Sequence, residues 1–397
     1  MNDIYNYILH FLLYGNDEAA QHVGYTADKS EWSKYKVVVI PSGHFGKDWV
    51  LPDMNSPHAQ KLEGHDTWII DIDIIYNTLF FISRAEELTN KERDEHGRFA
   101  ARFSILGQHN RLLIPLADEY GRLLVKLLEL PVISPEFSRI CLTHDTDALT
   151  QYRSLRGTLG GLRRGEFRQT ARAWQDLTFD PVYTFPWLVK QDAAIENAQS
   201  FYFIKLTGGK GFDSPQYGFR NSDYQAFRRL LLDSGAVMGL HSSYYGKLPA
   251  AVPAASGIDI RFHRSHYLRC SIEQMQRLCE AGITDDFTMG FADMAGFRLQ
   301  TSRPVRWINP ETMQLTQLTL HPLTVMDGTL SQANYMNLNE DEAYFLCQRL
   351  FDKVRQNNGE LCLLWHNTSV TGEGSNLPAS TRSYHRSLYP KLLSLLQ

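Results

Sequence analysis

Two kinds of apolar pattern alternate through the first third of the chain. Val37–Ile40 and Trp68–Ile72 are short, mostly apolar runs of the kind found in buried strands, and Pro41 ends the first of them. Three further segments repeat apolar residues at helical spacing: 1–15, 73–87 and 117–130. The pattern predicts a small α/β unit that begins with an amphipathic helix.

After Pro135 the pattern becomes a regular alternation of strand and helix. The predicted strands are the apolar runs 140–143, 200–204, 236–240 and 361–365, and the predicted helices are 224–234, 271–281 and 341–357. Such alternation implies parallel strands with crossover helices, hence an open α/β sheet or an α/β barrel. Pro131 and Pro135 restrict the segment between the two patterns, so we predict a domain of residues 1–132 followed by one of residues 133–397.

Polar side chains follow several of these predicted strands. Asp145 and Asp147 come after the first, His241 after the third and His366 after the last. Catalytic groups gather at the carboxyl ends of parallel strands, so these side chains could meet in one site. In an extended segment the side chains of residues i and i+2, here Asp145 and Asp147, point to the same side. Two carboxylates that face one cavity in this way repel each other unless a cation lies beside them.

Each of these residues also has an ordinary structural interpretation. The two aspartates could cap a turn at the end of a strand, and a single histidine such as His241, His266 or His366 is most often a hydrogen-bonded structural residue. Considered together, the carboxylates and imidazoles supply oxygen and nitrogen ligands suited to Zn²⁺ or a similar divalent ion, with positions left for water and substrate.

Composition and charge narrow the classes of protein to consider. With 43% hydrophobic and 21% charged residues, the 397-residue chain has the composition of a folded globular protein and the length for two domains. The formal net charge of -4 argues against a nucleic-acid partner. The apolar stretches fall short of the roughly 20 residues of a membrane span, so we expect no stable membrane insertion. Five cysteines, an odd number, favour reduced thiols and a cytoplasmic location.

Positive charge is concentrated in one segment of the chain. Six arginines crowd the glycine-rich run from Arg153 to Arg172. The run is either a solvated loop and helix face or a surface that meets an acidic glycan or phosphate, and both interpretations stay open.

Several short motifs follow one another in a fixed order along the second part of the chain. They are Leu142–Asp147 (LTHDTD), Gly239–Tyr244 (GLHSSY), Arg264–Arg269 (RSHYLR), Asp286–Phe291 (DFTMGF), Gly296–Arg298 (GFR) and Leu364–Asn367 (LWHN). This set resembles the polysaccharide deacetylase family, carbohydrate esterase family four, in a bacterial branch with an HDxD first motif. Residues 81–87 and 94–99 resemble the N-terminal extension of that branch. The resemblance therefore covers nearly the whole chain.

The resemblance implies a fold, an ion and a reaction. The fold is a distorted (β/α) barrel preceded by a smaller α/β domain, the ion is one divalent metal, and the reaction removes an acetyl group, usually N-acetyl, from a sugar. Asp145 matches the family's general base, Asp147 a metal-ligand carboxylate, and His241 the first histidine of the metal-binding motif. Arg298 matches the arginine that orients the base, and His366 the histidine that protonates the leaving group.

The chain departs from the wider family at one position of this site. The metal-binding motif usually has a second histidine four residues after the first, and here Tyr245 stands at that place. We therefore expect His266 to be the third ligand, beside Asp147 and His241, of an ion expected to be zinc.

The resulting expectation is a cytoplasmic, metal-dependent hydrolase that cleaves the C–N amide bond of an acetylated sugar or polysaccharide. Two alternatives stay open. Tyr245 in place of a histidine would fit a non-catalytic glycan-binding or scaffold protein on the same fold. The same groups would also serve a metal-dependent hydrolase of another amide bond.

Overall fold

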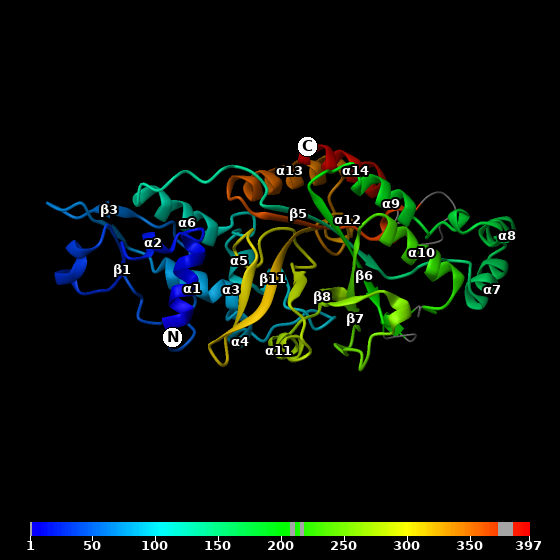
Figure 1. Cartoon of the computed structure of the whole chain (residues 1–397), viewed down its shortest axis with the longest axis horizontal. Helices are drawn as coiled ribbons and strands as arrows, with labels where there is room; N and C mark the ends of the chain where they lie inside the picture. The colour runs from blue at the N-terminus through cyan, green and yellow to red at the C-terminus, as the bar shows by residue number, and fades with distance from the viewer. Residues whose placement is uncertain (1, 207–210, 215–217, 372–383) are drawn as a thin grey trace.

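The computed structural model describes residues 2–206, 211–214, 218–371 and 384–397 and shows a mixed α/β chain with two β-sheets (Figure 1). The small sheet lies at one end of an elongated molecule, at the left of the view, and the large sheet occupies the middle. Helices α7 (Leu155–Arg163) and α8 (Phe167–Gln175) lie at the opposite end.

The N-terminal region, residues 2–132, is built on a four-stranded sheet. It consists of β1 (Val23–Tyr25), β2 (Val37–Val39), β3 (Ala59–Lys61) and β4 (Trp68–Ile70) in the order β1-β2-β4-β3. β1, β2 and β4 are parallel, and β3 pairs with β4 in the antiparallel sense. The two apolar runs predicted as strands are β2 and β4.

The three helices predicted for this region are present, but one of the predicted segments is divided into two helices. They are α1 (Asn2–Leu12), α3 (Ile74–Ser83) and α6 (Leu116–Leu127). Asp73 caps α3 by accepting a hydrogen bond from the Tyr76 amide, and Arg84, in the left-handed region at φ 64°, ends it. The segment predicted as one helix therefore continues as a separate α4 (Glu86–Thr89). Short segments complete the region: α2 (Asp17–Ala20), η1 (Lys29–Lys34), η2 (Ala101–Phe103) and α5 (Ile105–Gln108).

The large sheet closes into a barrel. Its strands are β5 (Arg139–Thr146), β6 (Ala198–Lys205), β7 (Val237–Ser242), β8 (Asp259–Ser265), β9 (Asp285–Met289), β10 (Val305–Asn309), β11 (Gln314–Met326) and β12 (Glu360–Leu364). Their order is β10-β11-β12-β5-β6-β7-β8-β9, and β9 pairs back to β11. Parallel strands thus form a closed ring from β11 round to β9, whereas β10 pairs antiparallel with β11 outside it. The expected α/β barrel with a smaller second sheet is confirmed.

Helices and short helical turns connect the barrel strands or follow the last of them. Besides α7 and α8 they are η3 (Leu177–Phe179), α9 (Phe185–Asp192), η4 (Gly211–Asp213), α10 (Ser222–Asp233), η5 (Ala254–Ser256), η6 (His266–Leu268), α11 (Ile272–Glu280), α12 (Asp327–Ser331), α13 (Glu340–Gln356), η7 (Asn367–Val370), α14 (His385–Leu393) and η9 (Ser394–Leu396). The three helices predicted from sequence are α10, α11 and α13.

The N-terminal region and the barrel share one apolar core. A single cluster of buried side chains includes members of α1 and α6 as well as of β10 and β11. The fully buried carboxylate of Asp118, on α6, accepts a hydrogen bond from the Ser302 amide at 2.7 Å and pairs with Arg303 Nε at 2.9 Å. The division at residue 132 stays a prediction, because the core continues across it.

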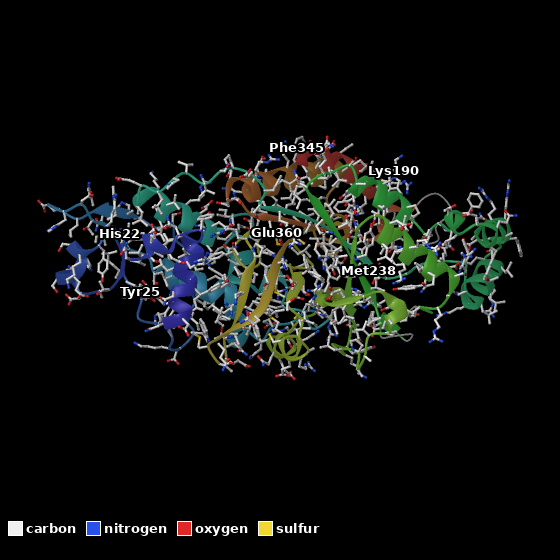
Figure 2. All side chains as sticks on the ribbon, in the orientation of Figure 1. His22, Tyr25, Lys190, Met238, Phe345 and Glu360 are labelled. Carbon is white, nitrogen blue, oxygen red and sulfur yellow. The ribbon has the colours of Figure 1, made fainter. Side chains whose placement is uncertain are left out.

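Charged side chains fill the end of the barrel at which the strands begin. His321 Nδ1 lies 2.7 Å from Glu360 and its Nε2 lies 3.1 Å from Asp285. Glu360, at the start of β12, is labelled near the centre of the molecule in Figure 2 and is 1% exposed. Burial lowers the pKa of His321, but the two carboxylates, Glu360 foremost, raise it to about 9. An imidazolium held between two carboxylates thus lies within the barrel.

This arrangement predicts a loss of stability on the alkaline side. The folded pKa of His321 is above its unfolded value of about 6.5, so its contribution is complete below that pH and is lost as the pH rises through about 9. The free energy of unfolding, measured with urea, should fall by an extra amount on the order of 2 kcal/mol between pH 6.5 and 9.5.

A His321→Gln variant should lack this extra fall, whatever its stability at pH 6.5. His22→Gln, at an exposed position labelled in Figure 2, is the control and should keep it. Identical pH profiles for the wild-type and His321→Gln proteins would contradict the prediction.

Candidate functional site

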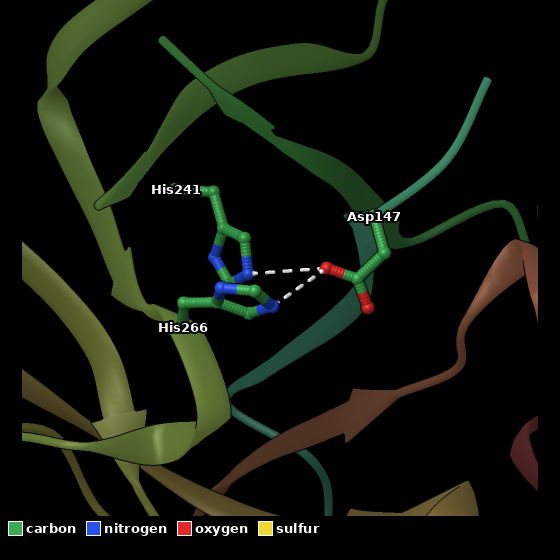
Figure 3. Close-up of side chains that lie close together, drawn as sticks. All are labelled: Asp147, His241 and His266. Atoms are coloured by element: carbon green, nitrogen blue, oxygen red, sulfur yellow. Dashed lines mark ion pairs between the residues drawn. The ribbon is translucent and has the colours of Figure 1, made fainter. Parts of the chain in front are cut away.

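Three candidate metal ligands converge at the carboxyl ends of barrel strands (Figure 3). Asp147 follows β5, His241 lies near the end of β7, and His266 directly follows β8. The Oδ1 atom of Asp147 is 3.1 Å from His266 Nε2 and 3.7 Å from His241 Nε2. One ligand atom from each residue lies within 4.8 Å of the other two.

The donor atoms of this set fit a divalent cation. His241 Nδ1 lies 3.1 Å from the Arg264 carbonyl oxygen and donates to it, so in the neutral ring Nε2 carries the lone pair. Among the described residues, His241 Nε2 and Asp147 Oδ1 are buried atoms without a hydrogen-bond partner. Ligands of a tetrahedral zinc site, with bonds of about 2.0 Å, lie roughly 3.3 Å apart. The three side chains therefore have the spacing and the unused lone pairs of a ligand set.

The protonation states of these groups also suit a metal site. Burial and the neighbouring His266 imidazole lower the pKa of His241, which keeps its ring neutral. Burial raises the pKa of Asp147, but the His266 and His366 imidazoles lower it by more, so this carboxylate stays ionised. Neutral imidazole and ionised carboxylate are the forms in which these side chains bind metals.

Asp213 supports the third candidate ligand from behind. Its Oδ1 atom lies 3.2 Å from His266 Nδ1 and accepts a hydrogen bond from the Tyr244 amide at 2.7 Å. Its Oδ2 atom accepts one from Ser243 Oγ at 2.5 Å. A carboxylate on Nδ1 fixes the orientation and the tautomer of the ring, so that Nε2 faces Asp147 as an acceptor.

Asp145 lies beside these ligands in a different environment. It is 3% exposed, and its Oδ2 atom is 3.7 Å from His241 Nε2. Its Oδ1 atom is 3.5 Å from Nη1 of Arg264, a fully buried side chain whose Nε donates to the Phe287 carbonyl at 3.1 Å. Burial raises the pKa of Asp145, and the Arg264 guanidinium opposes this rise. Arg264 thus holds one oxygen of Asp145 and leaves the other toward the pocket.

His366 faces the two aspartates from the segment between β12 and η7. Its Nε2 atom is 3.9 Å from Asp145 Oδ2 and 3.9 Å from Asp147 Oδ2. Both its backbone amide and its Nδ1 contact the carboxylate of Asp327, each at 2.7 Å. Burial lowers the pKa of His366, but Asp327 raises it to about 10 overall. The imidazole is therefore held in the protonated form with Nε2 toward the aspartates.

A pocket of about 370 Å³ opens over these groups. Asp145, Asp147, His266 and His366 line it, and so do His96 and Arg98 from the N-terminal region. His96 Nδ1 is 3.1 Å from the Tyr244 hydroxyl. Arg98 pairs with Asp94 at 2.7 Å and donates to the Tyr335 hydroxyl at 2.8 Å. Two distant parts of the chain therefore build one pocket, and its lining is mainly polar.

Arg298, expected from the resemblance to orient the base, has its ion pair in another part of the structure, and its role stays a prediction. Its guanidinium pairs with Glu87 of α4 at 2.8 Å and donates to the Gly290 carbonyl at 2.9 Å. Glu87 also pairs with Arg84 at 2.7 Å, so Arg298 belongs to a buried ion cluster between the N-terminal region and the barrel. The arginine beside Asp145 is Arg264, which reaches it from within the barrel.

Tyr245, at the place of the family's second histidine, lies outside the candidate ligand set. It is 60% exposed, in the turn after β7. The second imidazole of the set comes instead from His266, directly after the neighbouring strand β8.

Residues 8–131 match a family of unknown function, DUF7033. No curated protein matches the chain. A crystal structure of a "putative polysaccharide deacetylase" from Mycobacterium smegmatis is similar at a TM-score of 0.40 and 15% sequence identity, over 66% of this chain and 86% of that one. Membership of the polysaccharide deacetylase family stays a prediction.

Two further observations concern the setting of the chain. None of the helices in the described residues has the length and apolar character needed to cross a bilayer. All five cysteines are free thiols.

Three supporting residues were not identified as such from the sequence: Arg264, Asp213 and Asp327. Arg264 lies within the RSHYLR motif but inside strand β8. The sequence pattern indicates site residues only where they directly follow a predicted strand. Asp327 does follow a strand, β11, and recognising Leu323–Met326 as a strand end would have identified it. Asp213 follows β6 by several residues, and nothing in its local sequence indicates a histidine partner.

The support given by Asp213 is testable. Asp213→Asn replaces the carboxylate on His266 Nδ1 by an amide, so zinc affinity should fall by about 10- to 100-fold. The measurement is competition with a chromophoric chelator, together with the melting temperature of the metal-free protein. Asp233→Asn, at an exposed position on α10, is the matched control and should bind zinc as the wild type does. Unchanged zinc affinity in Asp213→Asn would exclude this role.

Proposed function

We propose that this chain is a metal-dependent hydrolase that removes an acetyl group, chiefly N-acetyl, from a sugar or polysaccharide intermediate. One observation carries the proposal. A buried carboxylate, Asp145, and a protonated imidazole, His366, lie against the candidate metal ligands within the same pocket. Hydrolysis of an amide needs these groups together: an activated water, a base for its proton and an acid for the departing nitrogen.

The ligand set favours zinc. Asp147, His241 and His266 offer one oxygen and two imidazole nitrogens, which leaves an open position as catalytic zinc sites do. A divalent ion held there supplies Lewis acidity, because it lowers the pKa of a water ligand and polarises an acyl carbonyl.

Asp145 is placed to accept the proton of the attacking water. Arg264 engages its Oδ1 atom, so Oδ2 is the basic oxygen that faces the candidate ligands and His366. The guanidinium also limits the rotation of the carboxylate. A general base must first lie within hydrogen-bonding reach of the proton that it accepts, and only then does its pKa decide its efficiency. The contact with Arg264 would fix this position.

His366 is placed to give a proton to the leaving nitrogen. Asp327 holds its Nδ1 and keeps the ring protonated, and Nε2 points toward the two aspartates across the pocket. As the C–N bond breaks, the electron pair stays on nitrogen and takes the Nε2 proton, so an amine departs instead of an amide anion. General acid–base help of this kind contributes about 10²- to 10⁴-fold to the rate.

The pocket suits a sugar in its size and lining. A volume of about 370 Å³ lies in the range of small-ligand sites, and carboxylate, imidazole, amide and hydroxyl groups dominate its surface. Tyr267, 36% exposed, and Tyr335 add aromatic faces. An acetylated sugar is thus our proposed substrate class.

The proposed role of Asp145 as a base predicts that its substitution lowers activity but leaves metal binding unchanged. Asp145→Asn should lower the rate of deacetylation by about 10²- to 10⁴-fold while bound zinc stays near one equivalent, because Asp147, His241 and His266 are unchanged. The measurements are amine release from N-acetylated amino sugars and metal analysis of the same samples. Asp341→Asn, at an exposed position on α13, is the control.

Removal of the metal is the complementary experiment. Dialysis against a chelator should abolish hydrolysis, and added zinc should restore it. Full activity of the metal-free protein or of Asp145→Asn would refute the proposed mechanism. Release of amines from non-sugar amides alone, in the same substrate panel, would instead assign the site to hydrolysis of another C–N bond.

A further inference from the structure

Helices α7 and α8 form a packed pair that projects at the end of the molecule opposite the N-terminal region (Figure 1). Gly165, in the left-handed region at φ 76°, makes the turn between them. Gly161 allows their close approach, because a Cβ atom there would lie 2.4 Å from Thr170 Oγ1. Arg153 ties the pair to the N-terminus of α10 through an ion pair with Asp223 at 2.7 Å.

The α7–α8 pair presents apolar side chains to water. Leu155, Leu159 and Leu162 are spaced at i, i+4 and i+7 and therefore lie on one face of α7. They are 79%, 46% and 39% exposed, and Phe167, the first residue of α8, is 63% exposed. Single exposed apolar residues are ordinary, but a row of them on successive helical turns marks an interaction surface.

Exposed arginines accompany this apolar row. Arg156, Arg163, Arg168 and Arg172 are all exposed on the same two helices. Within the described part of the chain none of these four forms an ion pair with an acidic side chain. Arg164 differs, because it pairs with Glu166 at 2.9 Å. The pair therefore carries a local excess of positive charge on a chain whose net charge is -4.

We infer that the α7–α8 pair is a docking surface for an anionic lipid bilayer. Aliphatic side chains in a row, flanked by arginines and on short helices, match the interfacial mode in which an apolar face enters the acyl boundary and cations contact lipid phosphates. An acidic glycan would use the arginines but would gain little from three leucines. A second copy of the chain would bring the same positive charge to the interface, which opposes association.

This inference does not depend on the proposed enzymatic function. The docking surface lies on the connection that follows β5, whereas the candidate metal ligands are Asp147, His241 and His266. Binding is reversible and peripheral, because the surface consists of side chains on two helices of nine residues each.

Vesicle co-sedimentation tests the docking surface. The full chain should bind vesicles of phosphatidylcholine with phosphatidylglycerol and not vesicles of phosphatidylcholine alone, and binding should weaken as salt rises from 0.05 to 0.5 M. Leu155→Ser with Leu159→Ser should weaken binding about tenfold or more. Arg163→Gln with Arg168→Gln should weaken it about 25-fold, from roughly fivefold for each arginine.

A matched control is available on another exposed helix. Phe345, 61% exposed on α13 and labelled at the top of Figure 2, lies four residues before the exposed Arg349. Phe345→Ser with Arg349→Gln removes one apolar group and one charge, and it should leave vesicle binding unchanged. Equal melting temperatures across the variants show that each is folded.

Several results would overturn the inference. The first is failure of the full chain to bind the anionic vesicles. The second is equal binding to vesicles of phosphatidylcholine alone. The third is a loss of vesicle binding in the α13 control variant as large as the loss in the α7–α8 variants. Binding to dextran sulfate that matches vesicle binding and is insensitive to the leucine substitutions would assign the surface to soluble polyanions. A dimer in sedimentation velocity that Leu155→Ser with Leu159→Ser dissociates would assign it to self-association.

Discussion

The pairing of β11 with both β9 and β12 is the constraint on which the site depends. This pairing turns an open sheet into a ring, so that strands far apart in the sequence end at the same rim. In an open sheet, β9 would be an edge strand and the segments that follow β5 and β8 would lie three strand positions apart. Closure curls the sheet so that Asp147, after β5, and His266, after β8, lie 3.1 Å apart. Asp145 and His366, separated by more than half the chain, lie 3.9 Å apart because β5 pairs directly with β12.

A second regularity concerns the three imidazoles of the site. His241, His266 and His366 each engage an oxygen through Nδ1, namely the Arg264 carbonyl and the carboxylates of Asp213 and Asp327. Each therefore presents Nε2 to the pocket. Burial and the neighbouring His266 imidazole keep His241 neutral, whereas the carboxylate of Asp327 keeps His366 protonated. The same kind of Nδ1 contact thus orients both candidate ligands and the candidate acid.

The sequence predicts the parts of the fold that are uniformly apolar. β5, β6, β7 and β12 were predicted because their inward and outward faces are both apolar, as in buried parallel strands. β8, β9 and β11 were missed because buried polar groups such as Arg264, Thr288 and His321 interrupt their apolar pattern. Long-range charge pairs are likewise invisible in one sequence, so the ion pair between Arg298 and Glu87 of the N-terminal region could not be predicted.

The wall that His96 and Arg98 contribute to the pocket has a consequence for how this protein can change. The groups next to the candidate metal ligands come from the barrel, whereas part of the pocket wall comes from a loop in the N-terminal region. Under the proposed function, reactivity and selectivity would thereby be encoded in separate stretches of the gene. Substitutions in the first 132 residues would then alter which molecule enters without disturbing the groups that act on it, and a barrel separated from this region would have a different opening.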